Sequence, residues 1–169
     1  TPKFGAQVIR KVAELGWKPA HYIVSVSASQ AQVLEPAGLQ NAVGLITAST
    51  VKEPSDPTWT DDPDMIAYKK FMKEWFNDGD ASNTGNVVGY LMANFFVHMV
   101  KGAGDNLTRA NLMKQATHVD ALALPLLLPG VTLTVTPEDL STFGTFRTMR
   151  FDGKRWVLFG DPINVSRAK

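Results

Sequence analysis

The sequence lacks cysteine, a long apolar run and an excess of either charge. Without cysteine the chain can form neither a disulfide nor a thiolate metal site, and it has no cysteine nucleophile. Its apolar runs all fall short of the roughly 20 residues that a membrane-spanning helix needs. The 17 Lys and Arg residues against 16 Asp and Glu leave a net charge of +1, which supplies no field to hold a polyphosphate. We therefore expect no nucleic-acid partner and no membrane span.

Catalytic and cofactor motifs are missing as well. The sequence contains no GxSxG, GxGxxG, GxxxxGKS or GxxxxGKT pattern, so nothing marks a nucleophile elbow, a dinucleotide site or a P-loop. His21, His98 and His118 have no second histidine or carboxylate at metal-ligand spacing. The acids of residues 51–64 lack the glycine and the alternating spacing of a calcium loop, so a solvated loop that ends in a helix cap fits them better. We expect no enzyme activity, no metal and no cofactor.

The composition that remains is globular, with 44% of the 169 residues hydrophobic and 20% charged. Thr1 and Pro2 suit a helix start, and apolar residues spaced by three and four continue the helix to Gly16: Phe4, Val8, Val12 and Leu15. Apolar runs at 21–26 and 43–49 predict strands with a brief helix between them. This alternation predicts an α/β protein with parallel, helix-covered sheets. Because such a unit normally opens with a strand, the sequence looks truncated at a strand-to-helix turn.

Later segments predict further helices and a closing hairpin. Asp62 is a natural cap for a helix that reaches about residue 76, a more apolar helix covers 84–101, and a third helix begins at Thr108. In the third helix, Leu112, Met113 and Ala116 are expected to face inward. The Asp152-Gly153 pair between two alternating segments predicts an antiparallel hairpin at the end of the chain.

Two loops are candidate binding sites because of their position. Ligands of a parallel sheet bind at the carboxyl ends of its strands, and two loops of this chain would lie there: Thr1, Pro2 and Lys3, and Ser25, Val26, Ser27 and Ala28. Backbone N–H groups at a helix start, together with hydroxyls, suit a carboxylate or another polar ligand. The alternative is that these serines only cap the short helix that follows them.

Four runs of the sequence resemble, in the same order, the substrate-binding proteins of branched-chain amino-acid-type ABC transporters: TPKFGAQVIRKVAELGWKP, VSVSAS, LEPAGLQNAVGLITAS and FRTMRFDGKRWVLFG. The resemblance implies a type I periplasmic binding protein, with two α/β lobes joined by three crossing strands and the ligand between the lobes. It implies that this chain is a carboxyl-terminal portion of such a protein. Residues 1–48 and 142–169 would belong to the second lobe, and 50–141 to part of the first.

The function that the resemblance implies is solute binding outside the cytoplasm for an ABC uptake transporter. The protein would be periplasmic or lipid-anchored, with a membrane permease as its partner, and it would not be an enzyme. The two candidate loops match the positions from which the second lobe of this family contacts its ligand. The alternative is a ligand-sensing domain of the same fold in a receptor or regulator.

The resemblance also bears on the ligand. Relatives that bind α-amino acids tend to place a carboxylate after the second strand, but no Asp or Glu occurs between His21 and Gln30. A buried ammonium without an anionic partner is costly. We therefore predict a small aromatic or aliphatic carboxylate rather than a free α-amino acid.

The predicted division of the chain also has a consequence for its surface. The helices at 63–103 and 109–117 would cover strands that are not in this chain, so their apolar faces would be exposed. A homodimer or strand exchange between chains is one way to cover them.

Overall fold

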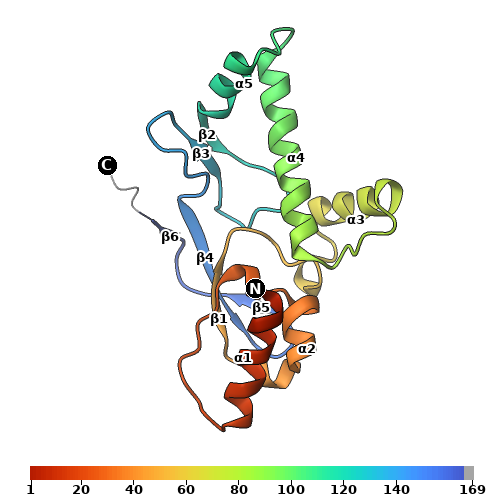
Figure 1. Ribbon diagram of the computed structural model, residues 1–169, viewed down its shortest axis with the longest axis vertical. Helices are drawn as coiled ribbons and strands as arrows, with labels where there is room; N and C mark the ends of the chain where they lie inside the picture. The colour runs from red at the N-terminus through yellow and green to blue at the C-terminus, as the bar shows by residue number, and fades with distance from the viewer. Residues whose placement is uncertain (166–169) are drawn as a thin grey trace.

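The structure is a computed structural model that describes residues 1–165, and it is elongated, with helices gathered at both ends (Figure 1). The helix α1 (Pro2–Glu14) lies at one end with the short α2 (Glu35–Ala37), and α3 (Pro63–Trp75), α4 (Thr84–Ala103) and α5 (Arg109–Ala116) lie at the other. Four shorter helical segments complete the set: η1 (Ser25–Ser27), η2 (Gln30–Leu34), η3 (Leu39–Ala42) and η4 (Pro57–Trp59). Within residues 1–165, none of the helices is both long enough and apolar enough to cross a membrane.

The strands form two small antiparallel sheets. One runs in the order β1 (Ile46–Ser49), β4 (Thr145–Phe151) and β5 (Trp156–Leu158), and β6 (Ile163–Asn164) pairs with the start of β4. The other consists of β2 (Val119–Leu122) and β3 (Leu133–Val135). The predicted hairpin is confirmed, because β4 and β5 pair across a turn in which the Asp152 side chain accepts the N–H groups of Lys154 and Arg155 at 2.8 and 2.9 Å.

The strand predicted over 21–26 is wrong. The N–H of Ile23 donates to the Ile46 carbonyl, and the N–H of Ile46 donates to the His21 carbonyl, which makes one parallel bridge. Beyond that bridge the chain turns into η1. Among the described residues no strand pairs with the other side of this segment, and Tyr22 and Val24 are exposed. A segment that pairs on one side only, and whose side chains are exposed to solvent, is stabilised too little to remain a regular strand.

The helix α1 has the predicted bounds but a different buried face. It ends at Glu14, and the φ of +63° at Gly16 allows the N–H groups of Gly16 and Trp17 to close on carbonyls of the last turn. Ala6 and Ile9 are buried, whereas three members of the predicted apolar stripe are exposed: Phe4, Val8 and Leu15. These large side chains stay outside because the helix lies close against η1 and η2, and small side chains on its inner face permit that approach.

The helices at the other end bury little of their apolar surface. The side chain of Asp62 caps α3 by accepting the Met65 N–H at 3.1 Å, as predicted. Of the long apolar α4, only Val87, Leu91 and Ala103 are buried. The helix α5 buries no residue fully; of its predicted inward face, Leu112 and Ala116 are half-buried and Met113 is exposed. The expectation that these helices expose apolar surface is confirmed by the exposed large side chains of α4: Val88, Met92, Phe96 and Val97.

The segment from Val51 to Asp64 is not the solvated loop that its charges predict. Lys52, Glu53 and Asp56 are each at most 6% exposed. The Lys52 ammonium lies 2.7 Å from the Asp62 carboxylate and 3.4 Å from that of Asp64. Buried charges need such partners. Because Lys52 meets these carboxylates only in the folded chain, its burial has no signal in the sequence.

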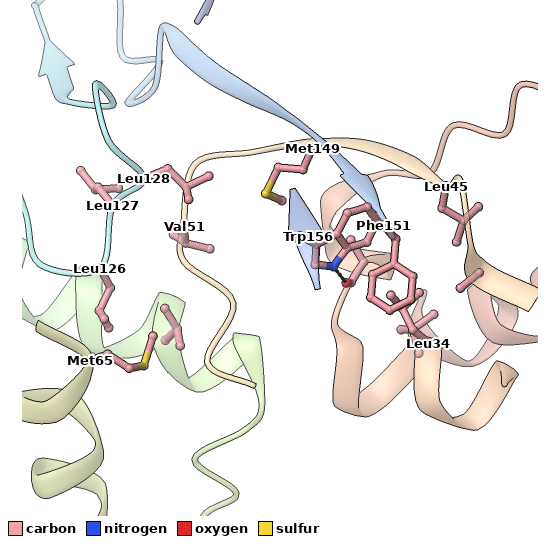
Figure 2. Packing of buried hydrophobic residues seen from close by; sticks show 14 of the residues in the cluster. Leu34, Leu45, Val51, Met65, Leu126, Leu127, Leu128, Met149, Phe151 and Trp156 are labelled. Atoms are coloured by element: carbon pink, nitrogen blue, oxygen red, sulfur yellow. Dashed lines mark hydrogen bonds between the residues drawn. The ribbon is translucent and has the colours of Figure 1, made fainter. Parts of the chain in front are cut away.

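Asp56 fastens this segment to the hairpin. One of its carboxylate oxygens accepts the N–H of Thr58 at 2.8 Å, and the other accepts the backbone N–H of Trp156 at 3.0 Å. Trp156 in turn donates its indole N–H to the Ala28 carbonyl at 3.0 Å (Figure 2). The hydrogen bond between Asp56 and Trp156 therefore links residues 100 positions apart in the sequence.

The buried core joins the two ends of the molecule. Figure 2 shows Leu34, Phe151 and Trp156 on one side, and Val51 with the run Leu126–Leu128 on the other. The backbone between β1 and α3 is held against that run, because the N–H of Leu128 donates to the Thr50 carbonyl at 2.8 Å and that of Lys52 to the Leu126 carbonyl at 2.9 Å.

Replacing Asp56 with Ala should lower the free energy of unfolding by about 2–3 kcal/mol, because the buried Trp156 N–H loses a charged acceptor. The matched control is Asp61→Ala, since Asp61 is exposed and its loss should change stability by less than about 0.5 kcal/mol. Urea unfolding of both variants measures the difference. Equal stabilities would contradict the role assigned to Asp56.

Candidate functional site

A hollow of about 270 Å³ lies between the end of the molecule that holds α1 and the start of α4. We call it the cleft. It is lined by the start of α1, by η1 and η2, by the exit of β1 and by the first turn of α4: Pro2, Ser25, Val26, Ser29, Gln32, Ser49, Thr50, Val51, Asn83, Thr84, Gly85 and Val88. Four stretches that are distant in sequence therefore meet at one place: Pro2, residues 25–32, residues 49–51 and residues 83–88.

Close contact between α1 and η1 positions the first wall of the cleft. A Cβ atom on Gly5 would lie only 2.9 Å from the Cβ of Ser27 and 3.4 Å from a methyl carbon of Val33. Only glycine allows this approach without a shift of the backbone. Gly5 thus fixes the place of η1, which carries Ser25 and Val26 into the cleft.

Ser29 gives this wall a polar group that the protein does not satisfy. Its side chain is 5% exposed, and its hydroxyl oxygen has no hydrogen-bond partner among the described residues. Nearby, the hydroxyl of Ser49 lies 3.3 Å from the backbone of Val51, so it is already engaged. A buried hydroxyl without a partner is uncommon, and in the lining of a cleft it suits a polar ligand.

The second wall is the start of α4. Asn83 caps this helix by accepting the Gly85 N–H at 2.8 Å. The hydroxyl of Thr84, the first residue of the helix, donates to the carboxylate of Glu53 at 2.9 Å. The cap and this hydrogen bond hold the first turn of α4 in place beside the cleft.

Glu53 lies behind Thr84 and is 6% exposed. Burial raises the pKa of its carboxyl group to about 7, although hydrogen bonds from the Thr84 hydroxyl, from Ser55 and from the Gln30 backbone oppose the rise. The desolvation of the charged form outweighs these donors. Glu53 is therefore a carboxyl group that changes its charge near neutral pH.

The cleft contains three of the seven residues that the sequence predicts for the site: Pro2, Ser25 and Val26. Ser27 and Ala28 are buried beneath it, and Thr1 and Lys3 are exposed outside its lining. Ser29 continues the predicted serine-rich loop. The contributions of β1, the helix cap at Asn83 and Glu53 were missed, because no local sequence signal relates those segments to the first loop.

The chemistry of the lining is neutral. Residues with hydroxyl and amide groups line the cleft together with four apolar side chains, and none of the described residues that line it carries a charge. No group of three or more potential metal ligands occurs within residues 1–165. His21, His98 and His118 do not line the cleft. The arrangement suits binding of a small molecule through hydrogen bonds and apolar contact.

Residues 1–155 match a protein family described as periplasmic binding protein. The chain belongs to this family. The match confirms the family resemblance and the α/β fold class of the sequence analysis. A search of the curated proteins finds no match.

Solved structures of periplasmic binding proteins share this fold. A branched chain amino acid ABC transporter protein from Thermus thermophilus with bound valine is 16% identical with a TM-score of 0.73, over 95% of this chain and 43% of that one. A substrate-binding periplasmic protein from Ralstonia solanacearum is 17% identical with a TM-score of 0.74, over 92% and 42%. A leucine binding protein from Thermotoga maritima is 13% identical with a TM-score of 0.63, over 96% and 42%. The chain therefore spans less than half the length of these relatives.

The close contact at Gly5 predicts that Gly5→Ala lowers the free energy of unfolding by about 1–3 kcal/mol through overpacking against Ser27. Gly89→Ala is the control, because nothing lies within 4 Å of a Cβ at that helical position and alanine favours a helix by up to about 1 kcal/mol. Urea denaturation compares the two. If Gly5→Ala is as stable as Gly89→Ala, the contact does not constrain η1.

Proposed function

We propose that this chain provides the ligand cleft of an extracytoplasmic solute-binding protein of an ABC uptake transporter. The ligand is a small aromatic or aliphatic carboxylate, held by hydroxyl and N–H groups while its apolar part contacts Val26, Val51 and Val88. The protein works in the periplasm or as a lipid-anchored protein at the cell surface, and it delivers its ligand to a membrane permease.

The observation that carries this proposal is the absence of charge from the described lining of the cleft. An α-amino acid brings an ammonium group, which is costly to bury without an anionic partner. A carboxylate needs donors, and the unpartnered hydroxyl of Ser29 is one. The Thermus thermophilus protein was solved with valine, so this chain differs from it in ligand class under the proposal.

The lobe division is part of the same proposal. Residues 1–48 and 142–165, with 166–169 outside the described residues, form the second lobe, and 50–141 belong to the first. The cleft receives α1, η1 and η2 from one side and the start of α4 from the other, as expected for a ligand clamped between lobes. A homodimer or strand exchange that covers the exposed face of α4 stays a prediction, which sedimentation velocity tests.

Titration calorimetry on the full-length protein tests the ligand class. Benzoate should bind at least about tenfold more tightly than leucine or valine. Only the amino acids bring an ammonium group that must be desolvated, and this costs well above the 1.4 kcal/mol that a tenfold change in affinity represents.

Ser29→Ala should weaken benzoate binding about tenfold or more by removing a donor to a charged group.

The control variant is Ser141→Ala, because Ser141 is exposed and does not line the cleft, so benzoate affinity should not change. Tighter binding of leucine or valine than of benzoate would contradict the proposed ligand class.

A further inference from the structure

Glu53 carries a buried carboxyl group close to the cleft. It does not line the cleft, but its carboxylate accepts the hydroxyl of Thr84, which does, at 2.9 Å. The backbone of Gln30, next to the cleft residue Ser29, is near enough to lower the pKa of this carboxyl group. Glu53 therefore lies behind the first turn of α4 and near the backbone beside Ser29.

No cation neutralises Glu53. The ammonium of Lys52, its neighbour in sequence, lies 2.7 Å from Asp62 and 3.4 Å from Asp64. From α3 the facing titratable group is Tyr68, whose pKa is raised to about 12 by burial and by the charges of Asp80 and Glu53. Tyr68 is thus neutral at physiological pH and donates its hydroxyl to the Ala81 carbonyl at 3.2 Å.

The group of α4 that faces Glu53 is the hydroxyl of Thr84. Gln30 of η2 and Ser55, two residues after Glu53, also lower the pKa of its carboxyl group. All of these are uncharged. The charge of Glu53 is therefore opposed by burial and supported only by neutral hydrogen bonds, so that the ionised and the protonated carboxyl group both occur near neutral pH.

The hydroxyl of Thr84 has one hydrogen and two lone pairs. While Glu53 is ionised, Thr84 uses its hydrogen for the carboxylate and can only accept hydrogen bonds from the cleft. When Glu53 takes a proton from solvent, the carboxyl O–H can donate to the Thr84 oxygen. The hydrogen of Thr84 is then free to turn into the cleft and donate to a ligand.

We propose that Glu53 and Thr84 form a proton-linked switch, so that binding of an anionic ligand in the cleft is accompanied by uptake of one proton at Glu53. The inference rests on the proposed function, because it requires an anion in the cleft. Protonation supplies a donor to that anion and removes a buried negative charge behind it. No bond other than the O–H bond of Glu53 is made.

Calorimetry of benzoate binding at pH 6, 7 and 8 in two buffers of different ionisation enthalpy measures the proton uptake. Benzoate stays ionised over this range, because carboxylic acids titrate near pH 4. With a Glu53 pKa of about 7, the Kd should rise about tenfold from pH 6 to pH 8 and nearly one proton should be taken up at pH 8.

Glu53→Gln should remove this dependence. Its amide donates to the Thr84 oxygen at every pH, so benzoate should bind with the affinity of the wild-type protein at pH 6 and without proton uptake. Thr84→Ser keeps the hydroxyl and should keep the pH dependence, whereas Thr84→Val should weaken binding at pH 6. Circular dichroism shows whether each variant is folded.

A ligand-free measurement tests the titration of Glu53 itself. Because the pKa rises on folding from 4.5 to about 7, this group contributes stability that is fully present below pH 4.5 and is lost as the pH rises to about 7. Glu53→Gln should lack that part of the pH dependence. If the variant does not fold, proton uptake by the wild-type protein on benzoate binding at pH 8 tests the switch by itself.

Benzoate binding without proton uptake, or an unchanged pH dependence in Glu53→Gln, would overturn the switch and leave the proposed function standing. Absence of benzoate binding to the wild-type protein at all three pH values would overturn both.

Discussion

The fold depends on the burial of a charged segment between β1 and α3. Lys52, Glu53 and Asp56 are buried within five residues of one another, and each is held by a different partner: the start of α3, the start of α4 and β5. Because buried polar groups are costly unless they are paired, the partners of these three side chains restrict the arrangement of the segment. That arrangement fixes where the helices at one end lie relative to the sheet at the other.

The cleft follows from this constraint. The hydrogen bond to Glu53 holds the first turn of α4, and the contact between Gly5 and Ser27 holds η1 on the opposite side. The space between them is lined by uncharged groups, and the carboxyl group of Glu53 lies behind Thr84. The cleft is therefore uncharged and largely apolar, which separates it from a site built for an ammonium group.

Local signals predicted what depends on local chemistry. The caps at Asp62 and Thr108 and the turn at Asp152 each satisfy backbone groups within a few residues, and the structure contains all three. The alternation of helices and strands predicted the α/β class, and the family resemblance added the type of fold. The strand at 21–26 was predicted wrongly, because a strand there depends on which segments lie beside it in the folded chain.

The charged residues of 51–64 show most clearly what the sequence alone could not predict. Acids and prolines are typical of a solvated loop, yet the donors that justify their burial come from positions as distant as Thr84 and Trp156. For the same reason only Pro2, Ser25 and Val26 of the predicted site residues line the cleft. Pairings of this kind are properties of the folded chain and have no signature in a short window of sequence.

The central claim is that the hollow between η1, η2 and the start of α4 binds a small carboxylate. A crystal structure of the full-length protein with 4-bromobenzoate tests it most directly, because the bromine is located by its anomalous scattering. We expect a bromine peak inside the cleft, with the carboxylate within hydrogen-bond distance of Ser29 and Thr84. A bromine peak at another place on the molecule, with no ligand in the cleft, would contradict it.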